Sequence, residues 1–237
     1  MNIRTIILDF DGTMGDSRSL IVRTLQQTIC ECRLPRRTDE ECAATIGLPL
    51  YQAFVSMFGI SDADGQRCAD TYRRIFMENK QEMTVKPFPN VIDTIRKLEA
   101  SGKTLAIASS RSRQSLVEYV EQYDIMDCIS CIVASDDIEK AKPAPDMVLR
   151  VLELTGGTPD TTLTVGDMTY DIDMGRAAGT LTCGVTYGNG TREDLSDADF
   201  LIDDFSEGRF VTTLLSSIIS PTAWGTEPPN VGFHSPR

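Results

Sequence analysis

Two closely spaced aspartates stand near the start of the chain, in the stretch ILDFDGTMGD at residues 7–16. Asp9 and Asp11 directly follow a hydrophobic run. Side chains two residues apart on an extended segment face the same side, so the charges of these two carboxylates repel each other. A loop that only had to turn could use one Asp and a Gly. The pair therefore indicates a site that is occupied by positive charge.

Further polar residues follow three later apolar runs of the chain. In chain order they are Ser109, Ser110 and Arg111 after the first run, Lys142 before a proline in SDDIEKAKPAP, and Asp167 with Asp171 after the third run. Carboxylates, hydroxyl groups and a lysine are all suited to binding charged ligands. Whether they meet depends on the elements that carry them.

Short apolar runs alternate with segments of helical periodicity over most of the chain. The runs predict strands at residues 3–8, 104–109, 131–135, 162–167, 181–188 and 200–205. The segments between them predict helices at residues 90–101, 112–123, 145–155 and 170–178. This alternation is typical of βαβ units. We expect an α/β fold with a Rossmann-like, mostly parallel sheet and helices on both faces.

The stretch from residue 17 to residue 83 has a different pattern. Four segments show helical spacing or helix caps, and no strand is indicated among them. We therefore expect an all-helical domain at 17–83, inserted into an α/β core formed by 1–16 and 84–220. The remaining residues, 221–237, are rich in Pro and Gly and are expected to form an irregular tail.

The composition is that of an ordinary globular protein of 237 residues, with 41% hydrophobic and 24% charged residues. Its net charge of −12 argues against a nucleic-acid or membrane partner. No apolar run approaches the ~20 residues that span a bilayer, and the first apolar run is too short for a secretory signal. We expect a cytoplasmic protein, either a monomer or a homodimer.

Histidine and cysteine chemistry find little support. The one histidine, His234, lies near the C-terminus, which argues against a Ser-His-Asp triad, a His base and a His-ligated metal. Seven cysteines are scattered along the chain, and the C-x-x-C formed by Cys128 and Cys131 lacks a second pair or a nearby His. Acid–base chemistry must therefore rely on carboxylates, lysines or thiols.

Ligands of an open parallel sheet bind beyond the carboxyl ends of its strands. The acidic pair, Ser109, Lys142 and Asp167 all fall at such ends, so we expect them to converge. Carboxylates without histidine suit a hard cation such as Mg²⁺, and Lys142 can bridge a carboxylate and a phosphoryl oxygen. Together these groups can neutralise the charge of a transferring phosphoryl group.

Four short motifs of the sequence resemble those of a known protein family. DFDGT, the serine after the second strand, KPAPD and VGDMTYDIDMGRAAG resemble the four motifs of the haloacid dehalogenase superfamily, in the same order, over residues 1–205. The helical insertion after the first motif resembles the cap of the phosphoglycolate phosphatase and β-phosphoglucomutase branch. The resemblance implies a Mg²⁺-dependent hydrolase with a helical cap.

The resemblance also implies roles for individual residues. Asp9 would be the nucleophile that becomes an aspartyl-phosphate, and Asp11 the general acid and base. The implied metal ligands are Asp9, Asp11, through its backbone carbonyl, and Asp167. The implied phosphate-binding residues are Asp9, Gly12, Ser109, Ser110 and Lys142, of which Lys142 is also catalytic. Supporting roles fall to Thr13, which helps to shape the turn, and to Asp171, which would act through water or behind the ligands.

We therefore expect a phosphatase for a small phosphorylated metabolite, most like phosphoglycolate phosphatase. Asp11 favours phosphoryl transfer, because a halide leaving group needs no proton. IGLPLYQ at residues 46–52 has no Arg, and the whole insertion has no His, which argues against a sugar-phosphate mutase. Phosphoglycolate, another small phosphomonoester and pyrophosphate all stay open as substrates.

Other interpretations stay open as well. The non-enzymatic alternative is a phospho-Asp signalling module, although a receiver domain is about half this length and carries its acceptor Asp on a middle strand. Arg111 could contact the substrate or be exposed. Arg73 and Arg74 are expected on a solvated helix face.

Overall fold

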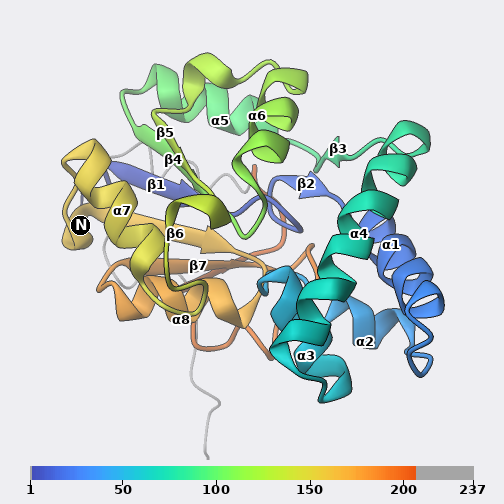
Figure 1. Ribbon diagram of the computed structural model, residues 1–237. Coiled ribbons are helices and arrows are strands. Elements are labelled where there is room, and N and C mark those ends of the chain that lie inside the picture. The colour runs from blue at the N-terminus through green and yellow to red at the C-terminus, as the bar shows by residue number, and fades with distance from the viewer. Residues whose placement is uncertain (1, 207–237) are drawn as a thin grey trace, which may run out of the picture.

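The computed structural model describes residues 2–206, and its centre is a six-stranded sheet (Figure 1). Every neighbouring pair in this sheet is parallel. The strands lie in the order β5 (Cys131–Val133), β4 (Thr104–Ala108), β1 (Thr5–Leu8), β6 (Thr162–Gly166), β7 (Leu181–Val185) and β8 (Phe200–Ile202). The expected α/β class is confirmed. The expectations for 207–220, for the tail 221–237 and for His234 lie outside the described residues.

The central strand, β1, sets the level at which the neighbouring strands end. Leu8 pairs with Ile107 of β4 on one side and with Val165 of β6 on the other. The residues that follow these three strands therefore leave the sheet at the same edge. The register thus brings Asp9 and Asp167 to adjacent positions.

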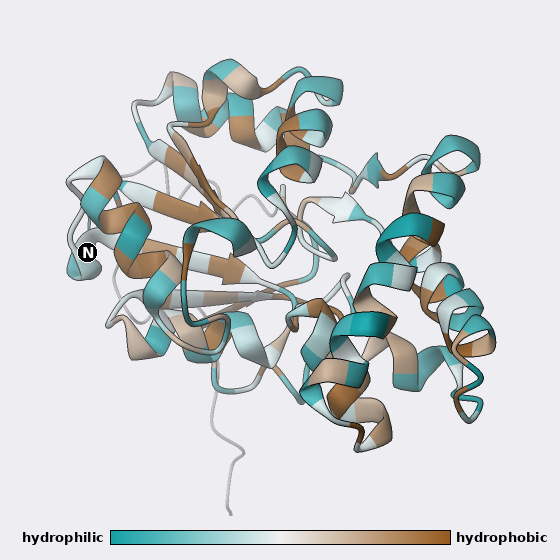
Figure 2. Ribbon diagram, in the orientation of Figure 1, coloured by the Kyte–Doolittle hydropathy of each residue, from teal (hydrophilic) through white to brown (hydrophobic). Residues whose placement is uncertain are grey.

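Helices cover both faces of the sheet because its strands are apolar on both sides. Ile6 and Leu8 of β1 pack in one core with α5 (Val91–Ala100) and α6 (Arg113–Gln122). Ile7, which points to the opposite face, packs in a second core with α7 (Asp146–Thr155) and α8 (Thr169–Ala177). Brown, hydrophobic residues accordingly stand in β1, β4 and β6 in Figure 2.

Four helices lie to one side of the sheet, beyond the carboxyl ends of its strands (Figure 1). They are α1 (Arg18–Glu31), α2 (Asp39–Ala43), α3 (Leu50–Phe58) and α4 (Asp62–Glu82). They enclose a third hydrophobic core of their own, which includes Leu25, Phe54 and Tyr72. We call them the helical segment. Its limits as a separate domain, 17 and 83, stay a prediction.

Two short antiparallel strands join the helical segment to the sheet. Strand β2 (Gly15–Asp16) precedes α1, and β3 (Lys86–Pro87) follows α4. The chain therefore enters and leaves the segment at one place. The described residues also include three short 3₁₀ helices, which are η1 (Met126–Cys128), η2 (Ser135–Asp137) and η3 (Pro159–Thr161).

Each observed strand of the sheet is one to three residues shorter than the sequence indicated, and the difference is greatest for the last two strands. The strand predicted at 181–188 ends at Val185, and the strand predicted at 200–205 ends at Ile202. Beyond Val185 the chain turns toward the sheet edge, where the Tyr187 hydroxyl donates to the backbone oxygen of Thr13. The apolar pattern continues there because Tyr187 packs against the core and not because the strand continues. In the part of the chain that the structure describes, no helix is long and apolar enough to cross a membrane.

Candidate active site

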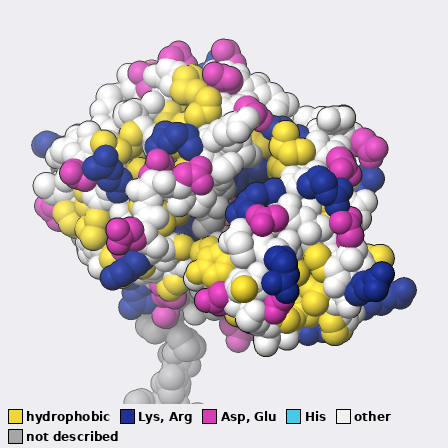
Figure 3. Space-filling view, in the orientation of Figure 1, with side chains coloured by type: hydrophobic (Ala, Val, Ile, Leu, Met, Phe, Trp, Pro, Cys, Tyr) yellow, Lys and Arg dark blue, Asp and Glu magenta, His cyan; other side chains and the backbone are white. Residues whose placement is uncertain are grey.

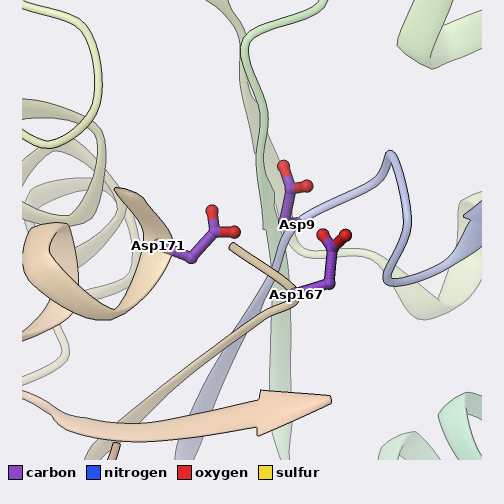
Figure 4. A group of neighbouring side chains, drawn as sticks. All are labelled: Asp9, Asp167 and Asp171. Carbon is purple, nitrogen blue, oxygen red and sulfur yellow. The ribbon is translucent and has the colours of Figure 1, made fainter. Parts of the chain in front are cut away.

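Three carboxylates meet at the carboxyl edge of the sheet (Figure 4). Asp9 follows β1, Asp167 follows β6, and Asp171 lies in the first turn of α8. Each offers one oxygen, and these oxygens lie within 4.8 Å of one another. All three residues are buried, with at most 5% of their surface exposed. We call this group the carboxylate cluster.

Lys142 connects two members of the cluster. Its Nζ donates to Oδ1 of Asp9 at 2.6 Å and to Oδ1 of Asp171 at 2.6 Å, and its side chain is fully buried. Lys142 lies in the loop between β5 and α7, whereas Asp9 follows β1 and Asp167 follows β6. Three different strands therefore position these side chains. One buried cation thus faces three carboxylates.

The charge balance of the cluster is reflected in its pKa values. Burial raises the pKa of Asp9 from 3.8 to about 7, against the opposing effect of Lys142. Burial, followed by the charges of Asp171 and Asp9, also raises the pKa of Asp167 well above its ordinary value. Burial alone would lower the pKa of Lys142, but the carboxylates of Asp171 and Asp9 outweigh it and raise that pKa. The single positive charge of Lys142 is therefore too little to balance the three carboxylates of the cluster.

A hard divalent cation fits this donor set. The carboxylate cluster presents only oxygen atoms from three separate side chains, which is the chemistry that Mg²⁺ prefers. A cation would also supply the charge that Lys142 alone does not.

Asp167 is held from several sides. Thr13 Oγ1 donates to its Oδ1 at 3.2 Å, and Asn189 donates to its Oδ2 from the backbone N at 2.7 Å and from Nδ2 at 2.9 Å. Gly12 has a φ of +83°, and a Cβ there would lie 2.0 Å from Asp167 Oδ2. Only glycine fits between the acidic turn and Asp167.

Asn189, which holds Asp167, is not among the residues that the sequence predicts at the site. It stands in GNG, directly after the apolar run that begins at residue 181, so it follows a strand as the other site residues do. An asparagine between two glycines is equally typical of a turn, so the sequence pattern does not distinguish Asn189 from an ordinary loop residue.

The two serines after β4 lie in different places. Ser109 is buried with 1% of its surface exposed, and its hydroxyl accepts from the backbone N of Arg111 at 3.4 Å. Ser110 donates its hydroxyl to the backbone oxygen of Gly47 at 2.6 Å, in the helical segment. The structure therefore places the Ser110 side chain against the helical segment.

Asp11 forms an ion pair apart from the cluster. Arg111 Nε donates to its two oxygens at 2.9 and 2.8 Å, and Ser17 also donates to it. The Arg111 side chain is only 8% exposed, and its guanidinium lies over the rings of Phe10 and Phe76 at 5.3 Å each. Of the two interpretations left open for Arg111, the exposed one is wrong.

A cavity of about 570 Å³ lies next to Asp11 and Arg111, between the helical segment and the sheet edge. Its walls come from α1, α3, α4 and the loop between α2 and α3 on one side, and from α6 and the loops after β4 and β5 on the other. Figure 3 shows the groove between the two parts of the molecule. A ligand in this cavity would lie beside the residues of the carboxyl edge.

Arg73 and Arg74 of α4 are exposed, as expected. Arg74 pairs with Glu31 and Glu78, and Arg73 lies at the rim of the cavity and pairs with Asp70 at 2.5 Å. Cys128 and Cys131 are free thiols.

The chain is similar to known proteins along most of its length. The family described as haloacid dehalogenase-like hydrolase matches residues 6–185. Pyrophosphatase PpaX of Anoxybacillus flavithermus is 31% identical over 209 residues, which cover 87% of this chain and 95% of that protein. A protein called "Probable phosphatase IndB", from Dickeya dadantii, is 32% identical over 85% of this chain and 90% of its own.

A solved structure from Bacteroides fragilis, called a haloacid dehalogenase-like hydrolase, superimposes on this chain with a TM-score of 0.79. It is 25% identical, and the match covers 86% of this chain and 99% of that one.

Proposed function

This chain belongs to the haloacid dehalogenase-like hydrolase family, and we propose that it is a Mg²⁺-dependent phosphatase for a small phosphorylated metabolite. The observation that carries the proposal is the buried carboxylate cluster with Lys142 donating to Asp9 and Asp171. Such a cluster is costly to bury and has no evident structural purpose at a sheet edge. It is suited to holding a cation and a phosphoryl group.

The proposed reaction has two steps. An oxygen of Asp9 attacks phosphorus, the bond from phosphorus to the leaving oxygen breaks, and Asp11 gives that oxygen a proton. Water then attacks phosphorus, Asp11 takes a proton from the water, and inorganic phosphate leaves Asp9 as a free carboxylate. Lys142 holds Asp9 in place, and Ser109 binds a phosphoryl oxygen.

Mg²⁺ would be held by Asp9 and Asp167, with the backbone carbonyl of Asp11 and with Asp171 close behind. When bound, it would neutralise charge on the carboxylates and on the transferring phosphoryl group. Asn189 and Thr13 keep Asp167 oriented through the hydrogen bonds described above.

Asp11 has to change its partner during this reaction. Arg111 and Ser17 both donate to its carboxylate, so these oxygens are engaged and not free to reach a leaving oxygen. Release from Arg111 therefore precedes the proton transfer. We propose that the helical segment, whose Phe76 lies against Arg111, acts as a cap that couples this release to substrate binding.

Pyrophosphate hydrolysis is the second candidate, because the relative from A. flavithermus is called a pyrophosphatase. A sugar-phosphate mutase and a phospho-Asp signalling module are outcomes of the same experiment. The expected localisation in the cytoplasm and the expected monomer or homodimer also stay predictions.

The test is phosphate release from a panel of phosphomonoesters and pyrophosphate, with Mg²⁺ or with EDTA. We expect turnover only with Mg²⁺, and a loss of roughly 10³-fold or more in kcat for Asp9→Asn. The matched control is Asp173→Asn, an exposed aspartate of α8, which should leave kcat unchanged. Activity that survives Asp9→Asn would overturn the covalent mechanism. A phosphoryl adduct on Asp9 that persists without turnover would indicate the signalling module.

A further inference from the structure

We propose that the substrate carries its phosphate on a bulky, uncharged and largely apolar leaving group. This inference rests on the proposed function and deepens it. Its site is the cavity lined by Asp11, the residue that protonates the leaving oxygen in the proposed reaction; Asp9 itself does not line the cavity.

The size of the cavity favours a bulky leaving group. Its volume of about 570 Å³ lies within the range of roughly 300–1,000 Å³ that encloses drug-sized ligands. Pyrophosphate or phosphoglycolate would fill only a small part of it. Most of the remaining space would have to be filled by water against apolar walls.

The walls of the cavity are largely apolar on the side of the helical segment. The residues that form them are Ile21 and Leu25 of α1, Leu50 of α3, and Tyr72, Phe76 and Met77 of α4. The Tyr72 and Phe76 rings stack with centroids 5.8 Å apart, so they present a continuous aromatic surface. A leaving group with a ring or a branched carbon skeleton would gain most from this surface.

The cationic side chains of the cavity are already paired. Three cations of the described residues line it, and each has an acidic partner: Arg111 pairs with Asp11 at 2.7 Å, Arg73 with Asp70 at 2.5 Å, and Lys80 with Glu118. The Lys80 hydrogen bond lowers the pKa of Glu118, in keeping with a true ion pair. Among the described lining residues, Arg73 and Lys80 are therefore paired, and Arg111 is paired for as long as it holds Asp11.

Acidic side chains further disfavour a charged leaving group. Asp136 and Glu139 also line the cavity, on the loop that follows β5. A second phosphate or a carboxylate would bring negative charge toward them. This charge arrangement therefore selects against pyrophosphate and phosphoglycolate and in favour of an uncharged alcohol.

The experiment compares four substrates with the full-length protein and Mg²⁺: ethyl phosphate, 2-phenylethyl phosphate, phosphoglycolate and pyrophosphate. The two alkyl esters have leaving groups of similar basicity, so their difference reports binding of the ring. We expect kcat/KM for 2-phenylethyl phosphate to exceed that for ethyl phosphate roughly 10-fold to 100-fold. We expect phosphoglycolate and pyrophosphate to be poorer than 2-phenylethyl phosphate.

A variant with an added charge gives an independent test. Met77 lies on α4, lines the cavity and is 54% exposed, so we expect Met77→Lys to keep the fold and to place a further cation at the wall. It should raise the kcat/KM ratio of phosphoglycolate to 2-phenylethyl phosphate roughly twofold to fivefold. Met126→Lys is the matched control, because Met126 is also exposed but does not line the cavity. It should leave the ratio unchanged.

The outcomes separate the two proposals. If pyrophosphate or phosphoglycolate is the better substrate, or if the ring gives no advantage over the ethyl group, the inference about the leaving group is overturned while the phosphatase stands. If none of the four compounds is hydrolysed, the proposed function fails and the inference fails with it.

Discussion

Replacing Lys142 by methionine tests the electrostatic account of the site. Methionine keeps most of the volume of the lysine side chain and removes its charge. In the wild type the buried Nζ lies 2.6 Å from Asp9 and 2.6 Å from Asp171, so Lys142→Met leaves two buried carboxylates without their cation. Removing one partner of a buried ion pair costs about 3–5 kcal/mol. We expect a loss of that size in the free energy of unfolding at pH 8.

The loss should depend on pH in a definite direction. The pKa of Asp9 is already raised from 3.8 to about 7, chiefly by burial, and without Lys142 it should rise further. A carboxyl group whose pKa is higher in the folded protein destabilises that protein as the pH rises through this pKa. The deficit of Lys142→Met should therefore be smaller at pH 5.5 than at pH 8.

The assay is urea unfolding at both pH values, without divalent cations. The control is Lys140→Met in the same loop, which is exposed and should change the free energy of unfolding by less than about 0.5 kcal/mol. A second variant, Lys142→Met with Asp171→Asn, removes one of the stranded charges and should recover part of the loss. If Lys142→Met were as stable as the control at pH 8, the buried charge balance described here would be wrong.

Two further predictions concern the neighbouring groups. Arg111→Gln removes the buried partner of Asp11 and should lower the free energy of unfolding in urea by about 2–3 kcal/mol. The control Arg113→Gln breaks a half-exposed ion pair and should lower it by less than about 1 kcal/mol. Equal losses in the two variants would contradict the buried pairing of Arg111 with Asp11. In EDTA the melting temperature should fall as the pH rises toward about 7, because ionised Asp9 is disfavoured in the folded protein. Mg²⁺ should therefore raise the melting temperature more at pH 8 than at pH 5.5. A rise in melting temperature that is the same at both pH values would argue against metal binding at the cluster.

Much of the fold can be predicted from the sequence because it is encoded locally. Apolar runs such as TIIL can be buried on both faces only in a covered parallel sheet, and the helical spacing between such runs indicates the crossovers. Asp9 and Asp167 stand directly after two of these runs. Their place at the carboxyl edge therefore follows from the pattern, whichever strands turn out to be neighbours.

The order of the strands and the partners of the loop side chains depend on the tertiary structure. Nothing in the spacing of Arg111 and Asp11 shows that they pair, because 100 residues separate them. Their contact forms because β1 and β4 are neighbours and because Phe76 of the helical segment covers the guanidinium. The length of β7 is decided in the same way, by the contacts that draw Tyr187 and Asn189 to the site.

The hydrophobic pattern of the chain therefore shows which residue types follow the strands and which chemistry those types are suited to. The pairing of these side chains, Lys142 with Asp9 and Asp171 and Arg111 with Asp11, follows instead from how the strands and loops are assembled. Hydrophobic periodicity determines secondary structure over a few neighbouring residues. A buried charge, by contrast, requires a partner, and that partner can lie at any distance along the sequence.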